Sequence, residues 1–146
     1  MIHRIAKKYG TTYYAAFFCE RLFDRLPWGG GEFDCLIFSP SRKNSLKMER
    51  LLNDLPYAHI DWVFTTGIAS KYWHDCVDQK SVEKGIQKEI GDGHPMTAAF
   101  DEIRTPSDWN ISFNFGRHDQ FLFIFLNRSE TMVNRVKTLA GKIRER

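Results

Sequence analysis

The chain has 146 residues, of which 42% are hydrophobic, 27% charged and 14% aromatic, and its formal net charge is +3. A chain of this length is expected to form a single domain, residues 1–146, and its composition excludes an intrinsically disordered protein. No apolar stretch approaches the roughly 18 residues of a membrane span, and the first residues lack the apolar segment of a secretory signal. We therefore expect a cytoplasmic protein with no membrane association.

Charge and cysteine content narrow the functional classes further. Residues 60–105 carry an excess of Asp and Glu, whereas residues 1–59 and 106–146 carry an excess of Lys and Arg. This asymmetry is weaker than that of a dedicated nucleic-acid-binding domain. The three cysteines are far apart and form no Cys-x-x-Cys motif, which predicts free thiols rather than a disulfide framework or a thiolate zinc site.

Residues 1–31 are predicted to form an N-terminal arm that packs on an α/β core of residues 32–146. Within the arm, residues 11–26 have the composition of a strand, but apolar residues recur there every four positions: Tyr14, Phe18, Leu22 and Leu26. This spacing places them on one face of a helix, so we favour a helix that ends at Pro27.

Two apolar segments are predicted to be strands of a parallel sheet, residues 33–38 and 60–64. Residues 41–55 between them are predicted to be a helix with Asn44 or Ser45 as its cap. Its apolar stripe consists of Met48, Leu51, Leu52 and Leu55. The order of strand, helix and strand indicates a βαβ unit with parallel strands.

After residue 67, pairs of apolar residues recur every four positions and predict an amphipathic helix, whose opposite face carries the polar residues His74, Asp75 and Asp78. A short second helix is expected to start at Ser81 with Val82 facing inward, and another helix is expected over residues 96–103.

The C-terminal part contains one ambiguous segment and two clear ones. Residues 109–115 alternate in polarity like a half-buried strand, but residues 105–108 also suit the start of a helix, so both interpretations stay open. Residues 121–126 are predicted to be a central strand and residues 127–146 a closing helix. The fold predicted is a small three-layer α/β sandwich, Rossmann-like, with a mostly parallel sheet of three to four strands and an N-terminal helical extension.

Ligands of open parallel sheets collect at the carboxyl ends of the strands. Three loops are predicted to lie there, residues 39–41, 65–67 and 127–129. Thr65, Thr66 and Gly67 run into a helix N-terminus and are the candidates for a ligand crevice. Turns and caps require the same residue types, and the glycine-rich nucleotide fingerprints are absent from the sequence, so we favour a purely structural role.

One constellation resembles a metal or acid–base site: His74, Asp75, Asp78, Asp92 and His94. Two of its members are four residues apart and hence on one helix face. The set lacks a His-Glu-x-x-His motif, so we favour an acidic surface that recognises a partner, and we expect no catalytic residue, metal or cofactor. The segment around Asp92 could also form a phosphate loop, but a plain turn is favoured because no predicted strand precedes it.

Several of these stretches resemble a bacterial family of small α/β proteins of unknown function. The resemblance covers about residues 33–146 and includes residues 61–67, 74–78 and 95–102. In that family, a strand that ends in Gly is followed by an Asp-rich segment and a Met-Thr-Thr-Trp-His-like stretch. This chain departs from that stretch at Ala98 and Phe100. The resemblance implies the α/β fold and no activity.

We consider three functional hypotheses. The first is a non-enzymatic interaction protein, of the immunity or antitoxin-inhibitor type, that binds a protein partner through the acidic surface. The alternative is a small-molecule or nucleotide-binding enzyme or sensor that uses the crevice, with His74 or His94 as the acid–base group. The third is a nucleic-acid-binding protein whose contacts come from Arg135, Lys142 and Arg144.

Overall fold

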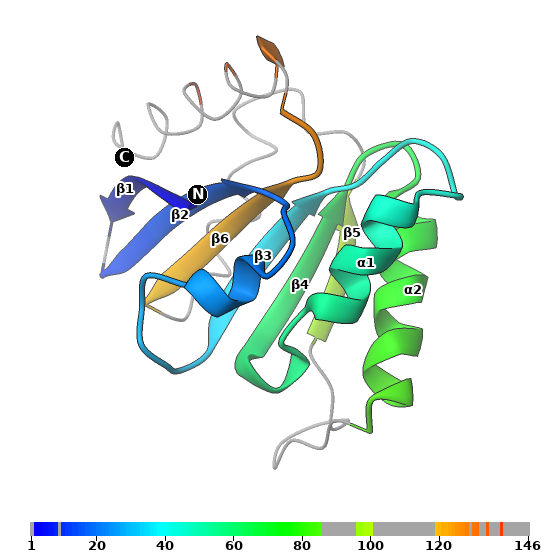
Figure 1. Cartoon of the computed structure of the whole chain (residues 1–146), viewed down its shortest axis with the longest axis horizontal. Coiled ribbons are helices and arrows are strands. Elements are labelled where there is room, and N and C mark those ends of the chain that lie inside the picture. Colours follow the sequence, from blue (N-terminus) through cyan, green and yellow to red (C-terminus); the bar gives the residue numbers. More distant parts are fainter. Residues whose placement is uncertain are drawn as a thin grey trace.

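The computed structural model describes residues 2–8, 10–85, 96–100 and 119–128, together with residues 130, 131, 134 and 138. The described residues form a mixed sheet with two α-helices on one face (Figure 1). The elements are β1 (Ile2–Lys8), β2 (Thr11–Phe17), the 3-10 helix η1 (Leu22–Arg25), β3 (Phe33–Phe38), α1 (Leu46–Asp54), the 3-10 helix η2 (Tyr57–His59), β4 (Ile60–Thr66), α2 (Ser70–Glu83), β5 (Met96–Phe100) and β6 (Gln120–Phe125). No helix in this part of the chain is long and apolar enough to cross a membrane.

Within the described residues, the sheet has six strands in the order β1-β2-β6-β3-β4-β5. The five strands from β2 to β5 in this order are parallel to one another, and β1 is antiparallel to β2. The α/β class predicted from the sequence is therefore confirmed. The predicted number of three to four strands is wrong, because the N-terminal residues and residues 96–100 add strands to the sheet.

The predicted N-terminal helix is also wrong, because residues 2–8 and 11–17 form two paired strands. β1 and β2 are joined through Gly10, whose φ of 84° suits a tight turn, and β2 continues the sheet by pairing with β6. Residues four positions apart lie on one face of a strand as well as on one face of a helix, so their spacing does not distinguish the two. Ala16 and Phe18 accordingly pack on the helix-covered face of the sheet.

A second helix prediction, over residues 96–103, is wrong because Met96–Phe100 forms β5. This strand pairs with β4 and places Met96 opposite Trp62. An apolar pattern of so few residues does not define a period, and pairing with a neighbouring strand decides the structure. The predictions for residues 101–118, including the open question of residues 109–115, lie outside the described residues.

The predicted βαβ unit is confirmed, since β3 and β4 are parallel neighbours connected by α1. The helix starts at Leu46, later than predicted, with Ser45 as its cap: the Met48 backbone N–H donates to Ser45 Oγ at 3.1 Å. The predicted apolar stripe of α1 is buried in the core between the helices and the sheet: Met48, Leu51, Leu52 and Leu55. The stripe thus fixes which face of α1 meets the sheet.

β3 is buried along its whole length, as its apolar run predicts, although it contains the carboxylate of Asp34. The β3–β4 ladder shifts register between Phe33 and Cys35, where β4 has one extra residue. At this shift Asp34 Oδ1 accepts a hydrogen bond from the Trp62 backbone N–H at 3.0 Å. The carboxylate thereby supplies a backbone partner at a point where the regular ladder is interrupted.

α2 runs without a break from Ser70 to Glu83, so the second helix predicted to start at Ser81 is wrong. The Ser81 hydroxyl lies inside α2 and donates to the Asp78 carbonyl oxygen at 2.9 Å, a back-bond that serines make within helices. Val82, predicted to face inward, is 66% exposed. Trp73 and Val77 are buried and hold α2 on the sheet.

The face of the sheet opposite the helices gathers aromatic rings. Phe38 stacks on Phe125 with ring centroids 4.3 Å apart, and the ring of Phe64 lies near that of Phe121.

All three cysteines are free thiols, as predicted, and Cys35 is buried in β3. Burial raises the pKa of the Cys35 thiol, and the nearby Asp34 carboxylate raises it further, so the thiolate is suppressed.

Of the predicted closing helix, residues 130, 131, 134 and 138 are helical and exposed, and most of the remainder lies outside the described residues.

The turn between β4 and α2 depends on a glycine. Gly67 has a φ of 126°, and a Cβ atom at this position would lie 3.0 Å from the Ser39 carbonyl oxygen. Ser39 itself binds the end of β4, because its N–H and its hydroxyl donate to the Thr66 carbonyl oxygen at 3.0 and 2.8 Å. The loops after β3 and β4 are therefore in direct contact, and this contact leaves little space for a side chain.

We expect Gly67→Ala to lower the free energy of unfolding by about 2 kcal/mol, because it combines an unfavourable φ with contact against Ser39. Gly30→Ala is the matched control, since a Cβ there meets no atom within 4 Å. Its effect should stay within about 0.5 kcal/mol. Urea denaturation of the two variants measures both values, and similar effects would contradict the role assigned to Gly67.

Candidate functional site

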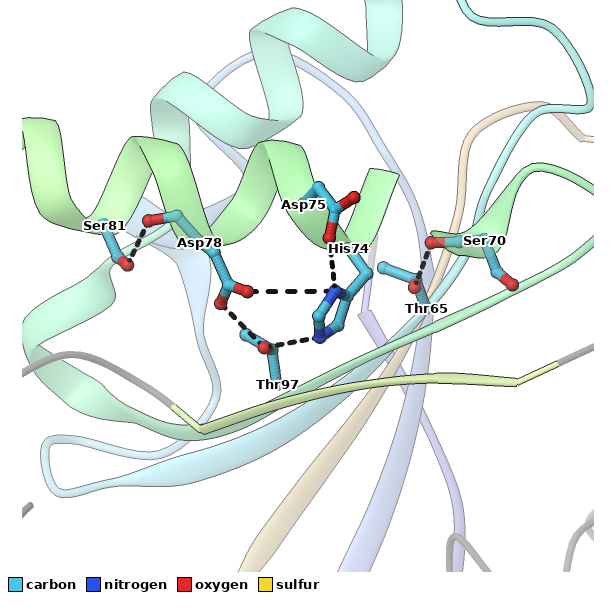
Figure 2. Close-up of polar contacts among 7 residues, drawn as sticks. All are labelled: Thr65, Ser70, His74, Asp75, Asp78, Ser81 and Thr97. Carbon is cyan, nitrogen blue, oxygen red and sulfur yellow. Dashed lines mark hydrogen bonds and ion pairs between the residues drawn. The ribbon is translucent and has the colours of Figure 1, made fainter. Parts of the chain in front are cut away.

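α2 and β5 bring polar side chains together at one side of the described sheet (Figure 2). His74 and Asp78 are one helical turn apart and point toward β5, which carries Thr97. Thr97 Oγ1 lies 2.7 Å from Asp78 Oδ1 and 2.8 Å from His74 Nε2. The Thr97 hydroxyl therefore fixes two side chains of α2 relative to the sheet.

The orientation of these side chains follows from how α2 packs. Trp73 and Val77 are buried against the sheet, and Trp73 Nε1 also donates to the Pro40 carbonyl oxygen at 3.2 Å. His74 and Asp78 each follow one of these buried residues, and successive helical residues are rotated by about 100° around the axis. This rotation directs both polar side chains along the sheet toward β5.

Asp75 completes the cluster from the solvent side. Its Oδ1 atom lies 3.1 Å from His74 Nδ1, and Asp78 Oδ2 lies 3.8 Å from the same nitrogen. The exposed fraction of the side chain is 23% for His74, 38% for Asp78 and 68% for Asp75. The cluster is therefore closed by β5 on one side and open to solvent on the other.

The hydrogen bonds of the cluster assign its protons. An ionised Asp78 carboxylate only accepts, so the Thr97 hydroxyl donates to it. A hydroxyl has a single proton, so the Thr97 oxygen must accept its other hydrogen bond from His74 Nε2–H. His74 Nδ1 then faces two carboxylate oxygens, Asp75 Oδ1 and Asp78 Oδ2.

Three of the five residues predicted for the partner surface meet in this cluster, whereas Asp92 and His94 lie outside the described residues. Asp75 is exposed, as predicted for this helix face, but His74 and Asp78 turn toward β5. The sequence does not point to Thr97, because its apolar neighbours suggest a helix. Only the pairing of β5 with β4 brings this residue beside α2.

The predicted crevice after β4 has a different character. Thr65 and Thr66 are 1% and 2% exposed, and Gly67 lies against Ser39. The Thr65 hydroxyl donates to the Ser70 carbonyl oxygen at 2.9 Å, at the start of α2 (Figure 2). This hydroxyl therefore stabilises the connection between β4 and α2.

A cavity of about 740 Å³ lies beside α1, where the chain leaves β2. Phe18 and Cys19 line it on one side, and Lys47 and Arg50 of α1 line it on the other. Lys47 Nζ also donates to Asn127 Oδ1 at 3.1 Å, which connects α1 with the residues after β6. Two carboxylates balance the two cations of the lining, so the cavity has no marked preference for ligand charge.

Comparison of the chain with protein-family models, curated proteins and solved structures finds no match.

The bond between Thr97 and Asp78 can be measured with a double-mutant cycle. We expect Thr97→Val and Asp78→Ala to be coupled by about 1 kcal/mol in the free energy of unfolding, because each variant removes one partner of the same half-buried hydrogen bond. A cycle of Thr97→Val with Lys71→Ala is the control, since Lys71 is an exposed residue of the same helix, and it should show coupling near zero. Equal coupling in the two cycles would contradict the assigned contact.

Proposed function

We propose that this chain is a non-enzymatic protein-interaction module, of the immunity or antitoxin-inhibitor type, that binds its partner through the α2–β5 surface. We define this surface by His74, Asp75, Asp78, Met96 and Thr97. The observation that carries the proposal is that Thr97 holds His74 and Asp78 in place while Asp75 stays exposed beside them.

Pre-ordered carboxylates suit the recognition of a basic partner. Immobilising a side chain on binding costs about 0.5–1.5 kcal/mol, and the contacts with Thr97 reduce this cost at His74 and Asp78. Exposed charges such as Asp75 steer a partner of opposite charge and raise the association rate. Met96 is 46% exposed next to Thr97 and supplies apolar area of the kind found at the centre of interfaces.

The proton arrangement supports binding rather than nucleophilic catalysis. A catalytic Thr-His-Asp set requires the hydroxyl to donate its proton to the imidazole, so that the histidine acts as a base. The Thr97 hydroxyl instead donates to Asp78 and accepts from His74. His74 therefore does not activate Thr97 in this geometry.

We also propose that residues 1–146 form one domain with a Rossmann-like, three-layer winding, and that the protein is cytoplasmic. The support for the winding is the succession of β3, α1, β4, α2 and β5, in which each new strand lies beside the previous one. Both connecting helices lie on the same face, as consecutive crossovers of one hand require (Figure 1). The support for a third layer is that the aromatic residues on the opposite face of the sheet are buried as well.

The cavity beside α1 favours one alternative, a small-molecule or nucleotide-binding enzyme or sensor. Its position at the carboxyl end of β2 is the kind of place where parallel sheets bind ligands. It is removed from the predicted crevice at Thr65, Thr66 and Gly67, whose described contacts are structural. The nucleic-acid hypothesis depends on Arg135, Lys142 and Arg144, which lie outside the described residues, and it stays a prediction.

The interaction proposal is tested by affinity capture from a host-cell lysate at low salt, followed by titration of the captured protein. We expect one stoichiometric, basic protein partner. Asp75→Lys should weaken its binding at least 10-fold, about 1.4 kcal/mol, because a carboxylate that faces a basic surface becomes a like charge. Asp75 is well exposed, so this variant should retain the stability of the parent chain.

Asp24→Lys is the matched control, because it makes the same charge change at an exposed position of η1. Its effect on affinity should be small. Equal losses for Asp24→Lys and Asp75→Lys would contradict the assigned surface. A chain that captures no protein but is stabilised against heat by a small molecule would favour the cavity alternative.

A further inference from the structure

We propose that His74, Asp75 and Asp78 form a binding site for one divalent first-row transition-metal cation, with Zn²⁺ as the probe. One ligand atom from each residue lies within 4.8 Å of those from the other two. This site would exist whether or not the α2–β5 surface binds a protein, so the inference goes beyond the proposed function and does not depend on it.

Three possible ligand atoms converge at one point of the cluster, namely His74 Nδ1, Asp75 Oδ1 and Asp78 Oδ2. Because Nε2 donates to Thr97, the neutral ring presents a lone pair at Nδ1 toward Asp75 Oδ1 and Asp78 Oδ2. With the ring in this form, three acceptor atoms face one another, an arrangement that a cation between them stabilises. A metal ion bound to Nδ1 and the two carboxylates satisfies all three atoms together.

The spacing of the atoms fits such an ion. Nitrogen and oxygen ligands of Zn²⁺ lie about 2.0–2.2 Å from the metal, so two ligands at roughly tetrahedral angles are about 3.3–3.6 Å apart. The two distances from His74 Nδ1, 3.1 Å to Asp75 Oδ1 and 3.8 Å to Asp78 Oδ2, lie on either side of this range. The Asp75 carboxylate, which is 68% exposed, is the ligand with the most freedom to adjust its position.

Thr97 supplies the support that metal ligands need from outside the coordination shell. Metal-binding histidines generally donate their second ring N–H to a neighbouring oxygen, which fixes the tautomer and the ring orientation, and ligating carboxylates are hydrogen-bonded in turn. Thr97 does both, because it accepts from His74 Nε2 and donates to Asp78 Oδ1 (Figure 2). Because Thr97 holds Asp78 Oδ1, the second oxygen, Asp78 Oδ2, faces His74 Nδ1 and is available to bind the metal.

The donor set also indicates the class of cation. Imidazole nitrogen favours Zn²⁺ and its first-row neighbours over Mg²⁺ and Ca²⁺, which prefer oxygen ligands alone. Three protein ligands leave a fourth position of a tetrahedral ion for water or for a group of a partner. The exposure of Asp75 places this open position on the solvent side of the cluster.

The test is calorimetric titration of the full reduced chain with Zn²⁺, with folding of each variant verified by circular dichroism. We expect one saturable site whose affinity falls at least 100-fold in His74→Gln. It should fall about 10- to 100-fold in Thr97→Val, and Thr97→Ser, which retains the hydroxyl, should restore most of it. Asp75→Asn provides a variant with little risk to folding, and it too should bind more weakly.

His59→Gln is the control, because His59 is an exposed histidine in η2 and should not affect Zn²⁺ affinity. The proposal is overturned if no saturable site appears at millimolar Zn²⁺, or if the site survives His74→Gln. It is equally overturned if nitrogen NMR of the His74 ring shows both nitrogens protonated in the presence of saturating Zn²⁺. Partner capture is measured separately with chelator present, so failure of this site and failure of the interaction proposal are distinguishable.

Discussion

The fold depends on the two parallel ladders of β3. Every residue of this strand is buried, so its backbone polar groups require hydrogen-bonding partners on both edges. β4 supplies one edge from the same βαβ unit, but β6 supplies the other from much later in the chain. Because β6 inserts between β2 and β3, it is the one described strand through which the N-terminal hairpin joins the rest of the sheet. The sheet centre therefore brings together distant parts of the sequence.

The strand order around β3 also determines where the polar cluster between α2 and β5 forms. From β3 to β5 the strands follow one another in one direction, and α1 and α2 cover the same face (Figure 1). Burial of Trp73 and Val77 sets the rotation of α2, and the pairing of β5 with β4 sets the position of Thr97. The polar contacts thus add precision to a geometry that apolar packing and the backbone ladder already determine.

The elements that could be predicted from the sequence are those whose pattern fits one structure only. Continuous apolar runs identify β3, β4 and β6, and stripes that persist over at least two turns identify α1 and α2. β2 and β5 fail this criterion, because their apolar spacing suits a helix as well as a strand and only strand pairing decides between the two. The same distinction applies to the residues of the site. The spacing of His74 and Asp78 along one helix predicts that they lie together, whereas Thr97 is 23 and 19 residues away from them in the sequence.

Binding of a metal ion and binding of a protein partner at the α2–β5 surface would be thermodynamically coupled, because both use the carboxylates of Asp75 and Asp78. A divalent cation neutralises the charge that attracts a basic partner, and a basic side chain from a partner occupies the space in which the cation would lie. Two ligands that use the same groups in this way oppose each other, and each must reduce the affinity of the other by the same factor. One exception follows from the open coordination position: a partner that supplies a fourth ligand would bind more tightly with the metal than without it. The sign of the coupling between metal binding and partner binding therefore distinguishes two kinds of partner. A partner attracted by the negative charge of the cluster binds more weakly with the metal present, and a partner that supplies the fourth metal ligand binds more tightly.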